Sequence, residues 1–185
     1  MSLLRPIVPA LSALLVNASG VVAANLCKYN PPLTAGAYAP SFVLGGEVMA
    51  AKTFDEAMLR QYPSTKVNVV YGAGNGSESD SFVGVLLWDL IREAGLVVAA
   101  DRKNDRLRKY VVISASDGYQ AVLALGEIIP DFGGQQVIVA YERDRQALDD
   151  DQGMARLVIP GDKRGGRHVN RITRIAVCGS TPAKK

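Results

Sequence analysis

Short runs rich in valine, isoleucine and other strand-forming residues limit most strongly what this 185-residue chain can fold into. They lie at 41–48, 66–71, 110–115, 119–125, 137–141, 155–159 and 169–177. Such runs, bounded by turn residues, predict strands, and Asp117-Gly118 between two of them indicates a β-hairpin. Helical segments do not alternate with these strands, so the order predicts the α+β class. The length allows one domain with a substantial core, which we expect at 41–178.

Two segments are expected to be helical. Thr53-Phe54-Asp55-Glu56 has the spacing of a capping box, which predicts a short helix over 53–61. Residues 83–94 are apolar on nearly every side and are followed by a glycine, which predicts a longer helix. A helix this apolar is expected to be buried, with Leu87 and Ile91 in the core.

Residues 1–24 look like an export signal, followed by an extended, proline-containing lead-in at 25–40. Arg5 supplies a positive charge, an apolar stretch follows, and Val22-Ala23-Ala24 offers small residues for cleavage. Prolines and polar residues interrupt this stretch, so it is too short to span a bilayer. We therefore expect a periplasmic or secreted protein with no membrane association once the signal is removed, ending in a tail at 179–185. A buried N-terminal helix is the alternative.

The net charge of +3 is small, so the sequence predicts no nucleic-acid partner. The charges are unevenly distributed, however. From Gly161 onward, basic residues outnumber acidic ones, whereas 142–151 is mainly acidic. The basic segment is suited to binding a small anion, and two solvated loops of opposite charge are the alternative.

Cys27 and Cys178 are the only cysteines, one near each end of the expected mature chain. In an oxidising compartment this placement predicts one disulfide that ties the two ends of the domain together. Two unpaired cysteines are the alternative.

The motifs outside the strands indicate neither a metal site nor a catalytic residue. Gly72-Ala73-Gly74-Asn75-Gly76 has neither dinucleotide nor P-loop spacing, which favours a turn that uses the backbone freedom of glycine. His168 is the only histidine, which excludes a His-rich metal site, and no GxSxG motif accompanies it. Asp149-Asp150-Asp151 lacks the glutamate of a calcium loop, because Pro160 stands there, so we expect a hairpin loop.

Four segments carry a family resemblance when they are taken in order. They are Val85-Leu86-Leu87-Trp88-Asp89-Leu90 with Ala94-Gly95, Ser116-Asp117-Gly118-Tyr119 with Leu125-Gly126-Glu127, Ala155-Arg156-Leu157-Val158-Ile159-Pro160-Gly161, and Gly166-Arg167-His168-Val169 with Arg174-Ile175-Ala176-Val177. In this order they resemble motifs of the sulfite-oxidase-type molybdopterin-binding family and span about 42–177. The resemblance implies the mixed, strand-rich fold of that family in a single domain.

In catalytic members of that family, a cysteine within a CxGN pattern ligates molybdenum through its thiolate. Ala73-Gly74-Asn75-Gly76 is similar to this loop, and the match places Gly72 at the cysteine position. Asn170 and Arg171 stand where the family has a lysine. The resemblance therefore implies the scaffold without its soft metal ligand. It leaves the cofactor open and disfavours molybdopterin.

The leading hypothesis is an exported binding module on this fold, without redox chemistry of its own. The residues expected to bind its small anionic or pterin-like ligand are Gly74, Asn75, Gly76, Arg156, Arg164, Arg167 and His168. Arginine suits this role because its planar guanidinium grips phosphate or carboxylate with two hydrogen bonds. Two alternatives stay open: a molybdopterin-dependent oxidoreductase with an atypical metal shell, and a structural or partner-binding domain with a vestigial pocket.

Overall fold

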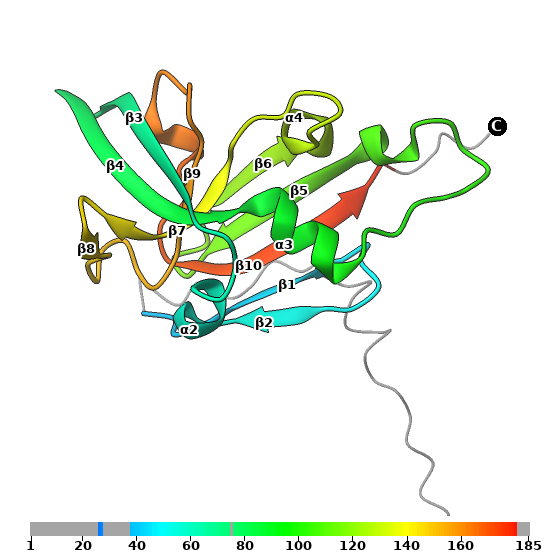
Figure 1. The fold of residues 1–185 in the computed structure, drawn as a ribbon, viewed down its shortest axis with the longest axis horizontal. Coiled ribbons are helices and arrows are strands. Elements are labelled where there is room, and N and C mark those ends of the chain that lie inside the picture. Colours follow the sequence, from blue (N-terminus) through cyan, green and yellow to red (C-terminus); the bar gives the residue numbers. More distant parts are fainter. Residues whose placement is uncertain (1–25, 28–37, 75, 181–185) are drawn as a thin grey trace, which may run out of the picture.

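The computed structural model describes residues 26–27, 38–74 and 76–180. The expected signal peptide at 1–24 lies outside the described residues, as do Asn75 and most of the lead-in and tail. The described residues form two five-stranded sheets, and a few short helices connect strands of these sheets (Figure 1). No helix of this part of the chain is long and apolar enough to cross a membrane.

The first sheet has the strand order β2-β1-β10-β5-β6. Its strands are β1 (Phe42–Gly46), β2 (Lys52–Phe54), β5 (Lys109–Ala115), β6 (Gln120–Ala124) and β10 (Ile172–Gly179). β1 and β10 run parallel, whereas the other neighbours pair antiparallel. The β5–β6 pair confirms the predicted hairpin, and Gly118 in its turn has a φ of 87°, which glycine adopts readily.

The second sheet has the order β3-β4-β7-β8, with β9 paired to β7. Its strands are β3 (Thr65–Ala73), β4 (Gly76–Leu86), β7 (Ile138–Arg143), β8 (Gln146–Ala147) and β9 (Arg156–Val158). The long β3–β4 hairpin extends away from the first sheet at the upper left of Figure 1. The remaining elements are α2 (Glu56–Leu59), α3 (Leu87–Ala94), α4 (Leu125–Ile128) and the 3-10 turns η1 (Asp105–Arg108) and η2 (Gly165–Arg167).

The main core packs one face of the first sheet against α3 and the inner strands of the second sheet. Leu87 and Ile91 are fully buried in it, as predicted. A smaller cluster fills the space between β3, β4, β7 and β9, and Tyr71 and Phe82 are its aromatic members. Alternate residues of β3 point into this cluster, which is how the strand directs Tyr71 inward.

The predicted helix over 83–94 is correct only from Leu87 onward. Residues 83–86 belong to β4 and pair with β7, and the backbone amide of Leu87 donates to the Val137 carbonyl at 2.9 Å. Gly84 permits this pairing, since a Cβ atom there would lie 2.3 Å from the Val139 carbonyl oxygen. An apolar run that is buried on all sides is compatible with either a strand or a helix. Here the pairing with β7 makes residues 83–86 a strand.

One other local expectation is corrected, and the extent of the expected glycine turn is narrowed. The short helix begins after Asp55, whose carboxylate accepts a hydrogen bond from the Met58 amide at 2.7 Å, and Thr53 lies in β2. The glycine-rich segment at 72–76 is mostly strand: β3 continues to Ala73 and β4 starts at Gly76. Gly74, the described residue between them, lies in a turn with a φ of 54°.

The predicted disulfide is present and joins Cys27 to Cys178, whose Cα atoms are 5.8 Å apart. Cys178 is buried in β10, so the bond fastens the start of the described chain to the first sheet. Leu26 packs beside it on β1, where a Cβ atom at Gly45 would approach the Leu26 side chain to 2.4 Å.

Candidate functional site

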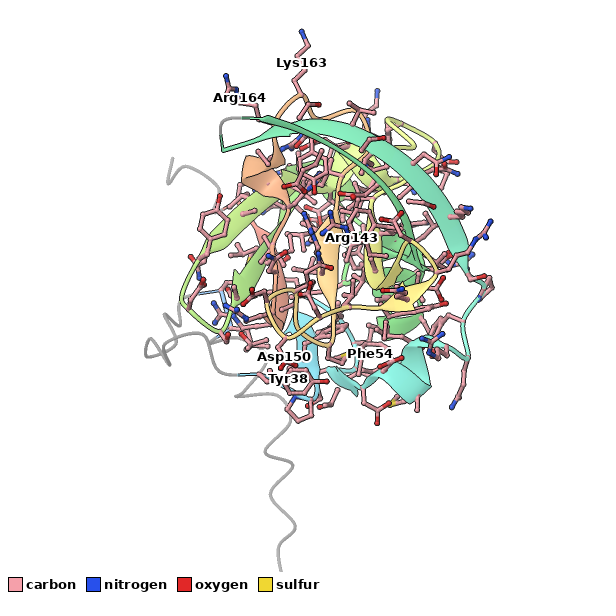
Figure 2. All side chains as sticks on the ribbon, turned by 90° about the vertical axis from the view of Figure 1, so that its left-hand side faces the viewer. Tyr38, Phe54, Arg143, Asp150, Lys163 and Arg164 are labelled. Atoms are coloured by element: carbon pink, nitrogen blue, oxygen red, sulfur yellow. A yellow bond between two sulfur atoms is a disulfide. The ribbon has the colours of Figure 1, made fainter. Side chains whose placement is uncertain are left out.

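A cavity of about 630 Å³ opens where the β3–β4 hairpin meets β9 and the segment before β10. Its volume lies in the range usual for small-molecule sites. Its lining residues are Tyr71, Gly72, Ala73, Gly74, Glu78, Arg143, Asp149, Asp151, Gln152, Arg156, Arg164, Gly165, Gly166, His168 and Asn170. Figure 2 shows Arg143 within the fold, whereas Lys163 and Arg164 point outward above the hairpin.

The loop at 163–166 is held close to the end of β3. The Gly72 amide donates to the Lys163 carbonyl at 2.9 Å, and Gly72 and Arg164 form a parallel bridge. Gly165 makes the close approach possible, since a Cβ atom there would lie 3.0 Å from the Tyr71 ring. The hairpin and this loop therefore form one wall of the pocket.

Tyr71 is the centre of a hydrogen-bond network beneath the pocket. Its hydroxyl accepts from Arg156 Nη2 at 2.9 Å and faces the carboxylates of Glu78 at 2.7 Å and Asp80 at 3.1 Å. A hydroxyl has one proton, so it donates to one of these carboxylates at a time. Arg143 binds Asp80 through Nη2 at 2.7 Å and Nε at 3.0 Å. Burial, followed by the hydrogen bond to Glu78, raises the pKa of Tyr71 to about 12, so its hydroxyl stays protonated at neutral pH.

Arg156 is buried to 7% exposure, yet no carboxylate among the described residues forms an ion pair with it. Its guanidinium lies over the Phe82 ring at 5.0 Å, and its Nε has no hydrogen-bond partner. With the Gln152 amide oxygen turned toward the arginines, that oxygen accepts from Arg143 Nη1 at 2.7 Å and Arg156 Nη1 at 3.2 Å. Charged side chains are seldom buried without a directly paired counter-ion, so an anion in the pocket would supply Arg156 with the partner that it lacks.

His168 lies beside this cation. Its ring packs edge-on against Tyr71, with centroids 4.6 Å apart, and Nε2 lies 3.2 Å from the Ile159 carbonyl oxygen. A carbonyl can only accept, so Nε2 has the proton and Nδ1 is left as an acceptor, without a partner. Burial, and further the positive charge of Arg156, lowers the pKa of His168, which is therefore neutral near pH 7.

The structure brings together only part of the predicted set. Arg156, Arg164, His168 and Gly74 line the pocket. Gly76 begins β4 outside the lining, and Asn75 lies outside the described residues.

Arg167 points elsewhere and makes ion pairs with Asp162 at 2.7 Å and Glu127 at 3.1 Å. These carboxylates raise the pKa of Arg167, and the hydrogen bonds that Arg167 donates to Asp162 contribute most. Its charge is thus already balanced within the protein.

Sequence reasoning missed the residues around Arg156, chiefly Tyr71 and Gln152, which contact it, and Arg143, which shares the Gln152 oxygen with it. The alternation of Val67, Val69 and Tyr71 along β3 was the available signal for the tyrosine. No local pattern indicates the other two, because β7 and the loop before β9 meet only in the folded chain.

A second cavity, of about 360 Å³, lies beside η1 and the end of β10. Its buried cation, Lys109, is paired with Glu47 and with Asp105 at 3.5 Å. This cavity therefore lacks the uncompensated charge that distinguishes the first.

The comparisons with known proteins agree with the expected fold. The family model described as "Oxidoreductase molybdopterin binding domain" matches residues 40–184. Among solved structures, the sulfane dehydrogenase SoxCD from Paracoccus pantotrophus superposes with a TM-score of 0.61 at 20% identity. The match covers 82% of this chain but only 40% of the SoxCD chain, and at this identity it shows the fold alone. No curated protein is similar enough to match.

The donor atoms near the pocket do not fit a molybdenum centre. Gly72 lines the cavity without a side chain, and both cysteines are joined to each other. The described residues also contain no group of three or more histidine, cysteine, aspartate or glutamate side chains placed to hold a metal ion. A soft thiolate ligand is thus missing where the cavity is. The cationic residues fit an anionic group instead.

Proposed function

The chain belongs to the oxidoreductase molybdopterin binding domain family, and from this premise we propose that it is an exported binding module for a small anionic or pterin-like ligand. It has no molybdenum redox chemistry of its own. The observation that carries the proposal is the buried guanidinium of Arg156, which faces a cavity of about 630 Å³ without a carboxylate partner.

The surrounding residues support binding by holding Arg156 in one position. Its Nη2 atom is fixed by Tyr71, whose hydroxyl is fixed in turn by Glu78 and Asp80. A preordered guanidinium loses little entropy when an anion arrives, and in a partly desolvated pocket its hydrogen bonds are strong. Arg164 at the mouth adds a second positive charge, with no ion pair among the described residues. A ligand with one anionic group at Arg156 and a polar or charged body at Arg164 fits both.

Calorimetry with the full chain tests the proposal, with inorganic phosphate, sulfate and a pterin monophosphate as probes. We expect at least one of them to bind. Arg156→Met should weaken that binding at least about tenfold, because it removes one or more charge-assisted hydrogen bonds to the anion. Arg92→Met is the matched control, because it removes the same charge from an exposed position on α3. Binding that survives Arg156→Met, or no binding of any probe, contradicts the proposal.

A second function follows from the family itself, namely a molybdopterin-dependent oxidoreductase with an atypical metal shell. Metal and pterin analysis of protein purified from its native compartment separates the two. We expect no stoichiometric molybdenum, because Gly72 supplies no thiolate. Stoichiometric molybdenum together with sulfite or sulfoxide turnover would favour the enzyme instead.

A further inference from the structure

We propose that the pocket takes up a proton together with its anion, and that the proton binds to Nδ1 of His168. The inference rests on the proposed function and adds its regulation: anion affinity increases as the pH falls. It follows from two neighbouring groups that the protein leaves unsatisfied, the buried cation of Arg156 and the unpartnered ring nitrogen of His168.

The ring of His168 is fixed in the orientation that this coupling requires. Nε2 is committed to the Ile159 carbonyl, and the Tyr71 ring packs against one side of the imidazole. Only Nδ1 can then accept a further proton. His168 as a whole residue is 7% exposed and lines the cavity, and its Nδ1 atom is buried in the empty pocket. Once protonated, Nδ1 becomes a donor that finds no acceptor in the described protein, and an anion oxygen would supply one.

The charges around His168 determine when it is protonated. Arg156 and Arg167 repel a second positive charge, whereas Asp162 attracts it, and Tyr71 is neutral. The other ionisable groups of the cavity are Glu78, Arg143, Arg164, Asp149 and Asp151. Of the acidic neighbours, Asp162 is already paired with Arg167 and Asp151 with Arg171. In the empty pocket the neutral imidazole is therefore favoured, in agreement with its lowered pKa.

A bound anion reverses this balance. Its charge lies beside Arg156 and His168, so it offsets the repulsion and accepts the new Nδ1–H bond. By linkage, a ligand that raises the proton affinity of a site binds more tightly when that site is protonated. If one proton is taken up with each anion, the affinity for the anion can increase by at most about tenfold for each pH unit that the pH falls.

Sulfate is the probe for this test, because its charge does not change from about pH 5 to pH 8, the range in which histidine titrates. Any pH dependence then belongs to the protein. We expect sulfate affinity of the full chain to increase as the pH falls, with a slope approaching the one-proton limit. Calorimetry in two buffers of different ionisation enthalpy should show net proton uptake on binding.

Two variants test which residue takes up the proton. His168→Gln keeps a side-chain donor for Ile159 but cannot ionise, so its sulfate affinity should not depend on pH. Asp151→Asn removes a cavity-lining carboxylate that lies outside the hydrogen-bond network around Tyr71 and Arg156, and it should keep the wild-type slope. Urea unfolding of both variants verifies that they are folded.

The outcomes separate the two proposals. Sulfate binding that depends on Arg156 but keeps its slope in His168→Gln overturns the proton coupling and leaves the binding site intact. A slope that disappears in Asp151→Asn assigns the proton to that carboxylate and likewise overturns it. Absence of any Arg156-dependent sulfate binding removes the coupling together with the anion site on which it rests.

Discussion

At the residue scale, the pocket is defined by what Arg156 and His168 lack. Most buried polar groups in proteins have hydrogen-bond partners, and buried cations have counter-ions. Here Arg156 Nε and His168 Nδ1 have no partner, although both residues lie in a well-packed wall beside Tyr71. Such groups lower the stability of the free protein, and they are retained where a ligand completes them.

Replacing Arg156 by methionine should therefore stabilise the free protein, by on the order of 1 kcal/mol. The change removes an uncompensated buried charge and fills the same space with an apolar chain. It also leaves the Tyr71 hydroxyl and the Gln152 oxygen with one donor fewer, which limits the gain. Urea unfolding at neutral pH and low salt measures the effect. A loss of several kcal/mol would mean that the guanidinium is needed for folding rather than for a ligand.

His168 should make the free energy of unfolding depend on pH. Its pKa is lowered in the folded state, mainly by burial, so protonation favours the unfolded chain. The stabilising contribution is complete above about pH 6.5, the pKa of an exposed histidine, and it is lost as the pH falls through the lower folded value. Unfolding curves from about pH 8 to pH 5 should show this loss in the wild type and a smaller one in His168→Gln. Equal pH profiles would contradict the burial of a neutral imidazole.

At the element scale, α3 connects the two sheets. Leu87, Leu90 and Ile91 are fully buried from its first turns, and the strand before it continues directly into the helix. Leu87→Ala should cost roughly 2–5 kcal/mol, because buried methyl groups are lost and the surrounding sheets cannot close the cavity. Arg92→Ala, on the exposed side of the same helix, should change stability by less than about 0.5 kcal/mol. If the two substitutions had equal effects in urea unfolding, the face of α3 that we assign to the core would be wrong.

The elements show how much of the fold the sequence predicted. The α+β class, the β5–β6 hairpin, the burial of Leu87 and the disulfide are confirmed. The strand at 76–86 was missed because its first half is polar and its second half uniformly apolar, so neither half shows the alternation of a half-buried strand. Its partner β7 decides the assignment and lies more than fifty residues away.

The candidate site, like the fold, could be predicted only in part from local sequence patterns. Arg156, Arg164 and His168 could be proposed from the motifs around them, and they do line one cavity. Arg167 has the same chemistry and belongs to the same motif, yet Asp162 and Glu127 neutralise it. Whether an arginine is free or paired depends on contacts from other elements, which no local pattern contains.

At the scale of the whole molecule, the disulfide joins Cys27, near the start of the expected mature chain, to Cys178 on the first sheet. Export remains a prediction, based on Arg5 and on Val22-Ala23-Ala24. Mass spectrometry of the N-terminus of protein recovered from its native host should find cleavage near Ala24-Asn25. An intact Met1 in folded, ligand-binding material would contradict it and would favour a retained N-terminal segment.

The Cys27–Cys178 disulfide should provide much of the stability of the exported protein. The two residues are 151 positions apart, so the bond restricts almost the whole unfolded chain, and it also fixes Leu26 against Gly45 on β1. Serine at both positions should lower the free energy of unfolding by about 2–5 kcal/mol. Reducing agent should produce the same loss in the wild type and none in the double variant, which separates the bond from the substitutions themselves. Thiol titration of the unfolded, non-reduced protein should find no free thiol, whereas two reactive thiols would show that the bond does not form in solution.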